Sequence, residues 1–141
     1  MKKSLIVLVL ILIILLSACS SGEGIVEIEE RFFLTQVNYI RRNADEYVGR
    51  TIRYEGMFQT FYWPTTGEFH MVLRNTLGCC GDDGIVGYEV YLGDIEPLPA
   101  NTWVEVVGML EWYEVDGLRQ LRVVASSITE MDERGAEVVL Q

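Results

Sequence analysis

Lysine is absent from the chain after position 3, and the first consequence is electrostatic. The 123 residues from Cys19 onward contain nine arginines, no lysine and all 21 acidic residues, which gives them a formal charge of −12. A surface this acidic repels phosphate backbones, so we expect no nucleic-acid partner. It also repels anionic lipid headgroups, so any attachment to a membrane must come mainly from another source.

The chain also lacks the residue patterns of common enzyme classes. His70 is the only histidine, and no serine or cysteine stands beside it at a catalytic spacing. There is no Gly-x-Ser-x-Gly run, no phosphate-binding loop and no dinucleotide fingerprint. Paired carboxylates occur, but they carry little information in so acidic a chain. We therefore expect a binding or structural protein and not an enzyme.

The long apolar run lies at the N-terminus. Leu5–Leu16 comprises twelve apolar residues after two lysines. This length fits the ~7–15 residues of a secretory signal and falls short of the ~20 that span a membrane. The following residues, Leu16-Ser17-Ala18-Cys19, resemble the lipobox of bacterial lipoproteins. The pattern predicts a signal peptide over residues 1–18.

The predicted lipobox also fixes the location of the chain. The thiol of Cys19 would accept a diacylglyceryl group, and two or more acyl chains give stable anchoring. We expect Cys19 to be lipidated and the chain to be held on the extracytoplasmic side of a bacterial membrane. The alternatives are an uncleaved anchor helix and an ordinary signal with a chance cysteine.

The hydrophobic period predicts one helix followed by strands. Residues 19–34 are expected to form the lipidated start and a tether, and Thr35–Val48 has apolar residues at helical spacing. Alternation with period two then predicts five strands, with a glycine-rich loop over Gly78–Gly84. Asp116-Gly117 predicts a two-residue hairpin. The predicted strands begin near Thr51, Phe69, Val86, Trp103 and Leu118.

Together these elements predict an all-β domain with one N-terminal helix over residues 35–130, followed by a charged, peripheral tail over 131–141. Five antiparallel strands with short turns favour a small five-stranded OB-like β-barrel. Gly56 and Gly108 lie inside strands, where glycine often marks a bend or bulge. The usual OB helix lies between strands three and four, and here the corresponding link, Gly93–Asn101, is short. A small β-sandwich is the alternative.

The adjacent pair Cys79-Cys80 is the strongest candidate for chemistry. Consecutive Cα atoms lie about 3.8 Å apart, below the ~4.4–6.8 Å that disulfides prefer, so a disulfide here would be strained. Alternatively, two thiolates could bind zinc or copper with help from Asp82, Asp83 or His70. The third interpretation is two small apolar residues in a turn. Zinc sites normally space their cysteines by two or more residues, so all three interpretations stay open.

Three sequence phrases, in this order, resemble the soluble domain of a bacterial two-component permease accessory-subunit family, a domain of unknown function. Tyr47–Gly56 is similar to the family phrase Tyr-x-Gly-Lys/Arg-x-Ile/Val-x-Val-x-Gly. Cys79, Cys80 and Asp83 match a Cys-Cys-x-x-Asp motif, and Trp103–Gly108 matches Trp-Val-x-Val-x-Gly. The resemblance covers about residues 36–130.

The resemblance implies an extracytoplasmic domain that works beside a multi-spanning permease, and the cysteine pair points to metal or metalloid cargo. Two features depart from the family. Its members usually carry membrane helices before the domain, whereas this chain has a lipobox. Gly81-Asp82 stands where the family favours small apolar residues.

Three functional hypotheses follow from the sequence. The first is a lipid-anchored binding or accessory module, with a permease and metal-ion handling as the implied setting. The second is a structural interaction domain of the envelope, in which Cys79 and Cys80 brace a loop. The third is a thiol-based redox enzyme that uses the same two cysteines.

Overall fold

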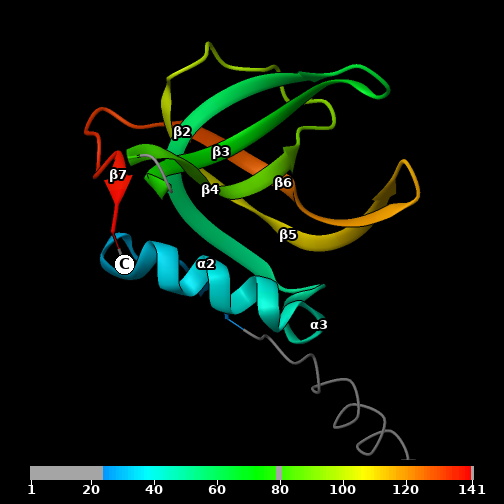
Figure 1. The fold of residues 1–141 in the computed structure, drawn as a ribbon, viewed down its shortest axis with the longest axis horizontal. Helices are drawn as coiled ribbons and strands as arrows, with labels where there is room; N and C mark the ends of the chain where they lie inside the picture. The colour runs from blue at the N-terminus through cyan, green and yellow to red at the C-terminus, as the bar shows by residue number, and fades with distance from the viewer. Residues whose placement is uncertain (1–23, 79–80, 141) are drawn as a thin grey trace, which may run out of the picture.

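The computed structural model describes residues 24–78 and 81–140, and for residues 81–83 it describes the backbone alone. Most of these residues lie in β-strands, and a short helical segment precedes the long strands (Figure 1). The predicted β class and the predicted N-terminal helical segment are therefore confirmed.

The helical segment starts earlier than predicted and is broken. In place of one helix over Thr35–Val48 there are a 3₁₀ turn, η1 (Glu30–Phe32), and two helices, α2 (Phe33–Arg42) and α3 (Ala44–Tyr47). The break falls at Asn43, where φ and ψ of −115° and 33° leave helical geometry. The Asn43 side-chain amide donates to the Tyr39 carbonyl at 2.8 Å. This bond satisfies a carbonyl group at the end of α2.

Five long strands form a closed ring of pairings. They pair in the order β2–β5–β6–β4–β3, and β3 pairs back to β2, so each of the five has two neighbours. All of these pairs are antiparallel except β4 with β6, which is parallel. Three of the strands begin at the predicted residue, and β3 and β4 begin earlier. Their bounds are β2 (Thr51–Trp63), β3 (Gly67–Gly78), β4 (Gly81–Tyr91), β5 (Trp103–Val115) and β6 (Leu118–Glu130).

Strand β2 closes the ring because it pairs with two different strands along its length. Its first half, residues 51–57, pairs with β5, and its second half, residues 57–63, pairs with β3. Gly56 lies at the change of partner. A Cβ atom at this position would lie 2.8 Å from the Leu73 carbonyl oxygen, so only glycine allows β3 to approach this closely.

The N-terminal boundary of the folded unit lies before the predicted residue 35. Strand β1 (Val26–Glu27) pairs in parallel with the start of β2. Ile28 and Phe33 are buried in the core. The prediction that the whole of residues 19–34 is a tether is therefore wrong from Val26 onward. A two-residue strand has too few positions to show a period, which is why the sequence did not reveal it.

The C-terminal boundary also lies beyond the prediction. Strand β7 (Val138–Val139) pairs in parallel with the end of β3, and Val139 is buried. The Asn75 amide donates to the Glu137 carbonyl at 2.8 Å. The tail predicted over residues 131–141 is thus not wholly peripheral, because its two valines return to the sheet.

The loop predicted over Gly78–Gly84 is shorter than expected. Strand β3 continues to Gly78 and β4 begins at Gly81, and these two glycines are paired. Gly84 lies within β4, where a Cβ atom would be 2.8 Å from the Thr76 side chain. This glycine therefore allows two strands to approach closely, and it does not mark a loop.

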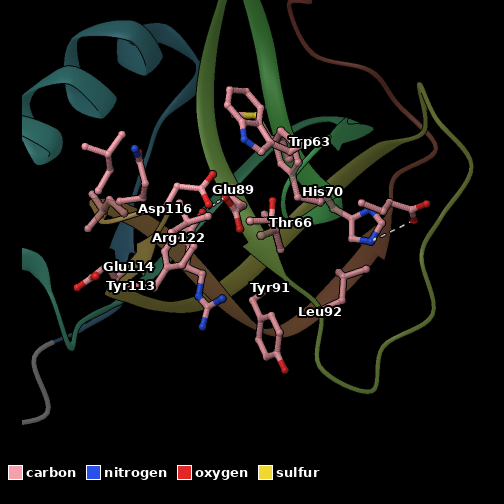
Figure 2. Close-up of a pocket in the computed structure, with 18 of the residues that line it drawn as sticks. Trp63, Thr66, His70, Glu89, Tyr91, Leu92, Tyr113, Glu114, Asp116 and Arg122 are labelled. Carbon is pink, nitrogen blue, oxygen red and sulfur yellow. Dashed lines mark hydrogen bonds and ion pairs between the residues drawn. The ribbon is translucent and has the colours of Figure 1, made fainter.

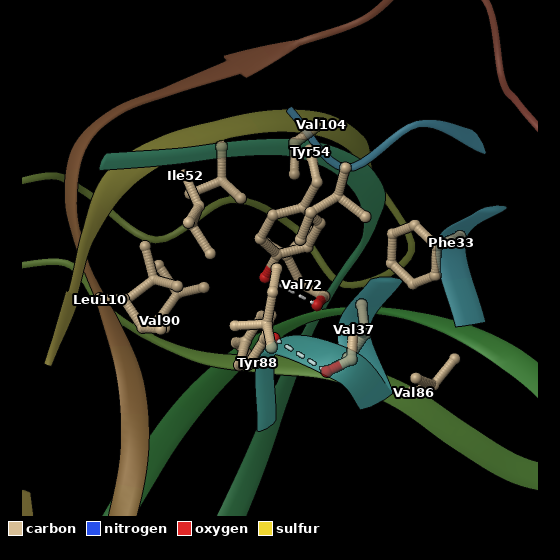
Figure 3. Packing of buried hydrophobic residues seen from close by; sticks show 14 of the residues in the cluster. Phe33, Val37, Ile52, Tyr54, Val72, Val86, Tyr88, Val90, Val104 and Leu110 are labelled. Atoms are coloured by element: carbon tan, nitrogen blue, oxygen red, sulfur yellow. Dashed lines mark hydrogen bonds between the residues drawn. The ribbon is translucent and has the colours of Figure 1, made fainter. Parts of the chain in front are cut away.

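Helix α2 lies against one end of the ring, and its apolar side joins the core (Figures 1 and 3). Phe33 and Val37 of this helix are fully buried. The Tyr88 hydroxyl donates to the Val37 carbonyl at 3.2 Å, which ties the helix to β4. The Tyr54 hydroxyl donates to the Val72 carbonyl at 3.1 Å. Both buried hydroxyls thus have a partner, as burial requires.

A buried arginine joins the two ends of the domain. Arg74 of β3 is 1% exposed, and its guanidinium lies 4.7 Å from the Phe33 ring and 4.8 Å from the Trp103 ring. It donates to the Ala136 carbonyl at 3.1 Å and pairs with Glu30 at 3.3 Å. The N-terminal and C-terminal segments therefore both contact the Arg74 guanidinium. These partners offset the cost of burying its charge.

Position 108 of β5 requires glycine because the backbone of β6 lies very close to it, and not because of an unusual backbone angle. The pairing register with β6 shifts between Val107 and Gly108, which confirms the predicted irregularity. A Cβ atom at 108 would lie 2.3 Å from the Val124 carbonyl oxygen. Because this neighbour is backbone, it cannot move aside without breaking the β5–β6 ladder.

We predict that Gly108→Ala destabilises the domain by ~1–3 kcal/mol, the usual cost of overpacking. The midpoint of thermal unfolding should fall by roughly 5–15 °C. Gly24→Ala is the matched control, since a Cβ atom there meets nothing within 4 Å. Equal melting temperatures for Gly108→Ala and the wild type would show that β6 does not lie this close to Gly108.

Candidate functional site

A groove of about 740 Å³ lies beside the seam between β4 and β6 (Figure 2). The ends of two hairpins border it, with Trp63 and Thr66 from the β2–β3 hairpin and Asp116 from the β5–β6 hairpin. Tyr91 and Leu92 contribute from the end of β4 and the residue after it. The groove is therefore built from three separate parts of the ring.

A side-chain hydrogen bond holds the two hairpins together at the rim. The Thr65 hydroxyl donates to the Asp116 carboxylate at 2.6 Å. Asp116 and Gly117 have φ of 50° and 75°, the left-handed conformation of a two-residue hairpin turn. The hairpin predicted at Asp116-Gly117 is confirmed, and its aspartate also fixes the neighbouring hairpin.

A stacked arginine lies on one wall of the groove. The Arg122 guanidinium lies 4.5 Å from the Tyr91 ring and 4.5 Å from the Tyr113 ring. It also binds the Glu111 carboxylate, at 2.8 Å through Nε and 2.7 Å through Nη2. The cation is thus held on two sides by rings and neutralised by one carboxylate, which makes this wall rigid.

A tyrosine–carboxylate pair crosses from β5 to β4. The Tyr113 hydroxyl donates to the Glu89 carboxylate. Burial raises the pKa of Tyr113 most strongly, and the hydrogen bond to Glu89 and the charge of that carboxylate raise it further. Tyr113 therefore stays protonated and acts as a hydrogen-bond donor inside the groove.

His70 lines the groove and is held firmly. Its side chain is 15% exposed and stacks on Phe58, with ring centroids 5.3 Å apart. Its Nδ1 lies 3.0 Å from the Thr60 hydroxyl, and its Nε2 lies 3.7 Å from a Glu68 oxygen. His70 therefore contributes a fixed imidazole to the lining of the groove.

The structure does not bring His70 to the cysteine end of its strand. Eight residues of β3 separate it from Gly78, which corresponds to roughly 26 Å of strand. Cys79 and Cys80 lie outside the described residues, and so do the side chains of Asp82 and Asp83, whose backbone belongs to β4. The predicted disulfide or metal site at these four residues stays a prediction.

The described side chains give no further candidate for a metal site. Within residues 24–78 and 81–140, no group of three or more histidine, cysteine, aspartate or glutamate side chains is placed to hold an ion. Zinc or copper therefore remains a hypothesis tied to the cysteine pair.

The charge of the groove is mostly negative. Four carboxylates line it, against two arginines. Both arginines already have partners, since Arg122 binds Glu111 and Arg41 donates to the Gly87 carbonyl. The four acidic residues are Glu68, Glu89, Glu114 and Asp116. A ligand of opposite or neutral charge fits this lining better than an anion.

Sequence reasoning missed most of these groove residues. Trp63, the last residue of β2, is 52% exposed. Tyr91 is 50% exposed and stands out of phase with Val90 and Leu92, which point into the core. An aromatic residue on the polar side of an alternating strand was the available signal. It could not, however, show that Tyr113 of another strand lies beside it.

The fold and the groove define a small β-domain whose hairpins form the rim of an acidic, aromatic groove. The chain belongs to the family of the DUF1980 C-terminal domain, which matches residues 16–135. This is a domain of unknown function, the kind of family that the sequence phrases resembled. No curated protein and no solved structure matches the chain. Across the described parts of the chain, no helix is long and apolar enough to span a membrane.

The buried tyrosines lead to a prediction about alkaline pH. Burial raises the pKa of Tyr54, Tyr88 and Tyr113 above the ordinary value of 10.0. The folded state therefore prefers the protonated phenols, and their stabilisation is present below pH 10 and lost as the pH rises above it. Tyrosinate absorbance should show these three groups ionising only as the domain unfolds.

The Tyr113→Phe variant provides the control for this titration. It should remove one of the three late-ionising groups and leave the two core tyrosines unchanged. If all seven tyrosines of the wild-type chain ionised in one step near pH 10 while circular dichroism stayed native, the burial of these three phenols would be wrong.

Proposed function

We propose that the protein is a lipid-anchored extracytoplasmic binding module built on a five-stranded OB-like barrel. The barrel is supported by the closed ring of pairings and by the parallel pair β4–β6, which joins the third and fifth long strands. In OB barrels, the hairpins after strands one and four flank the ligand face. Here these are the β2–β3 and β5–β6 hairpins, the two that border the groove.

The observation that carries the binding proposal is the exposed aromatic surface of this groove. Trp63 and Tyr91 are each about half exposed, although large rings are usually buried when they serve only the fold. Tryptophan, tyrosine and arginine are the residues that dominate binding hot spots. Arg122 packs on both Tyr91 and Tyr113, so the surface is already organised before a partner arrives.

The partner that fits this surface is a polypeptide segment of a neighbouring membrane protein. The excess of carboxylates in the groove opposes nucleic acid and other polyanions. The family phrases point to a multi-spanning permease as that neighbour, and lipid on Cys19 would hold the domain next to it. In this account the protein is not an enzyme, and it contributes recognition to the permease.

Metal handling forms a second, separate part of the proposal. Cys79 and Cys80 connect β3 to β4 in sequence, and the groove lies at the opposite ends of these strands, around His70 and Tyr91. An ion on the cysteine pair, zinc or copper, would thus be bound away from the partner surface. The alternative, an envelope domain whose cysteines brace the hairpin, shares the fold but needs no ion.

The proposal predicts a specific cross-link in living cells. A photoreactive amino acid at Tyr91 should form an adduct with a multi-spanning membrane protein, identified by peptide sequencing. The same amino acid at Met109 is the matched control, because Met109 is 44% exposed on β5 and does not line the groove. In the same cells, a fatty-acid label should mark the wild-type chain and not Cys19→Ala.

Three results would contradict parts of this proposal. Equal adducts from Tyr91 and Met109, or none from Tyr91, would remove the groove as the partner surface. An adduct with a soluble envelope protein would support the binding role and contradict the proposal that the partner is a permease. Fatty-acid label that persists on Cys19→Ala would remove the anchor, since no other residue can form the thioether.

A further inference from the structure

Helix α2 has a charge opposite to that of the rest of the chain. Residues 31–44 contain three arginines and no acidic residue, in a chain whose formal charge is −10. These three are a third of the arginines after Cys19. Such a local reversal of sign is not needed for solubility, because the rest of the surface is already highly charged.

The outward face of α2 combines this charge with exposed aromatic rings. Phe32, Thr35, Tyr39 and Arg42 recur at three- and four-residue spacing and are all exposed, opposite the buried side of the helix. Phe32 is 45% exposed and Tyr39 is 52% exposed. Arg31 extends this face, with its guanidinium 5.4 Å from the Phe32 ring. We call these five residues the α2 outer face.

The start of the described chain lies against the same helix. The Glu29 amide donates to the Gln36 side chain at 2.7 Å, and the Gln36 amide donates to the Glu27 carbonyl at 3.4 Å. Glu27 is the eighth residue after Cys19, so the backbone of Cys19 lies at most about 29 Å from this point. The tether therefore keeps α2, more than the distant hairpin ends of β2 and β3, near the membrane.

We propose that the α2 outer face rests on an anionic lipid surface and sets the orientation of the domain. This inference rests on the lipid anchor of the proposed function. Arginines attract anionic headgroups, and aromatic rings favour the interface between headgroups and acyl chains. The acyl chains supply attachment, and the helix decides which side of the domain faces the lipid.

Three of the acidic residues near this face have arginine partners elsewhere, including Asp45 with Arg119, while Glu29 and Glu46 flank the face at its two ends. Glu27 pairs with Arg53, and Glu30 pairs with Arg74. Arg41 is not counted in the outer face, because it donates to the Gly87 carbonyl and lines the groove. With α2 on the lipid, the groove opens at the side of the domain, where a neighbouring membrane protein could reach it.

The test uses the full-length, lipidated protein in phosphatidylcholine vesicles with or without phosphatidylglycerol. A phosphatidylglycerol analogue with a photoreactive headgroup marks the residues that touch the surface, and peptide mapping locates them. We expect labelling at residues 31–42. Arg31→Glu combined with Arg42→Glu should lower it roughly tenfold, given the ~1 kcal/mol that each basic residue contributes near such a surface.

The matched control makes the same change of charge elsewhere. Arg119→Glu combined with Arg134→Glu alters two exposed arginines outside α2 and should leave the α2 labelling at the wild-type level. Equal losses in both double variants, or labelling centred on the hairpins, would overturn the inference alone. A chain that does not float with the vesicles would overturn the anchor and this inference together.

Discussion

The double pairing of β2 is the constraint on which the rest of the structure depends. This strand pairs with β5 along its first half and with β3 along its second half. Gly56 allows β3 to lie close to β2 where the partner changes. If β2 kept one partner, the sheet would stay open and the β2–β3 and β5–β6 hairpins would not meet. The hydrogen bond between Thr65 and Asp116, and the groove beside it, are therefore consequences of closing the ring.

The closed ring gives the domain distinct sides, and each proposal uses one of them. The helical segment lies at one end, beside the point where the tether would leave (Figure 1). The groove lies along β4 and β6, and the cysteine pair follows the far end of β3. Lipid contact, partner recognition and ion binding would therefore not compete for the same surface, which suits a tethered accessory domain.

The sequence predicted the five long strands well because each is long enough to show a period of two. The Asp116-Gly117 pair predicted the β5–β6 hairpin. It did not predict β1 and β7, since two residues carry no period. It also did not predict the burial of Arg74, whose partners lie in four other parts of the chain. The sequence grouped His70 with Cys79, Cys80, Asp82 and Asp83 because they are near one another in the chain. In the structure an extended strand separates His70 from Gly78, so the two ends are roughly 26 Å apart. The groove could not be predicted without the fold, because strand pairing is what brings Tyr91 and Tyr113 to the same arginine, Arg122.

Hydrogen exchange along β2 tests this account most directly. If the ring is closed, protected amide protons in residues 52–56, which pair with β5, and in residues 59–61, which pair with β3, should open together with the free energy of global unfolding. A lower opening free energy for residues 59–61 alone would contradict the account. In that case the β2–β3 hairpin would separate from the ring, and the groove would have no fixed rim.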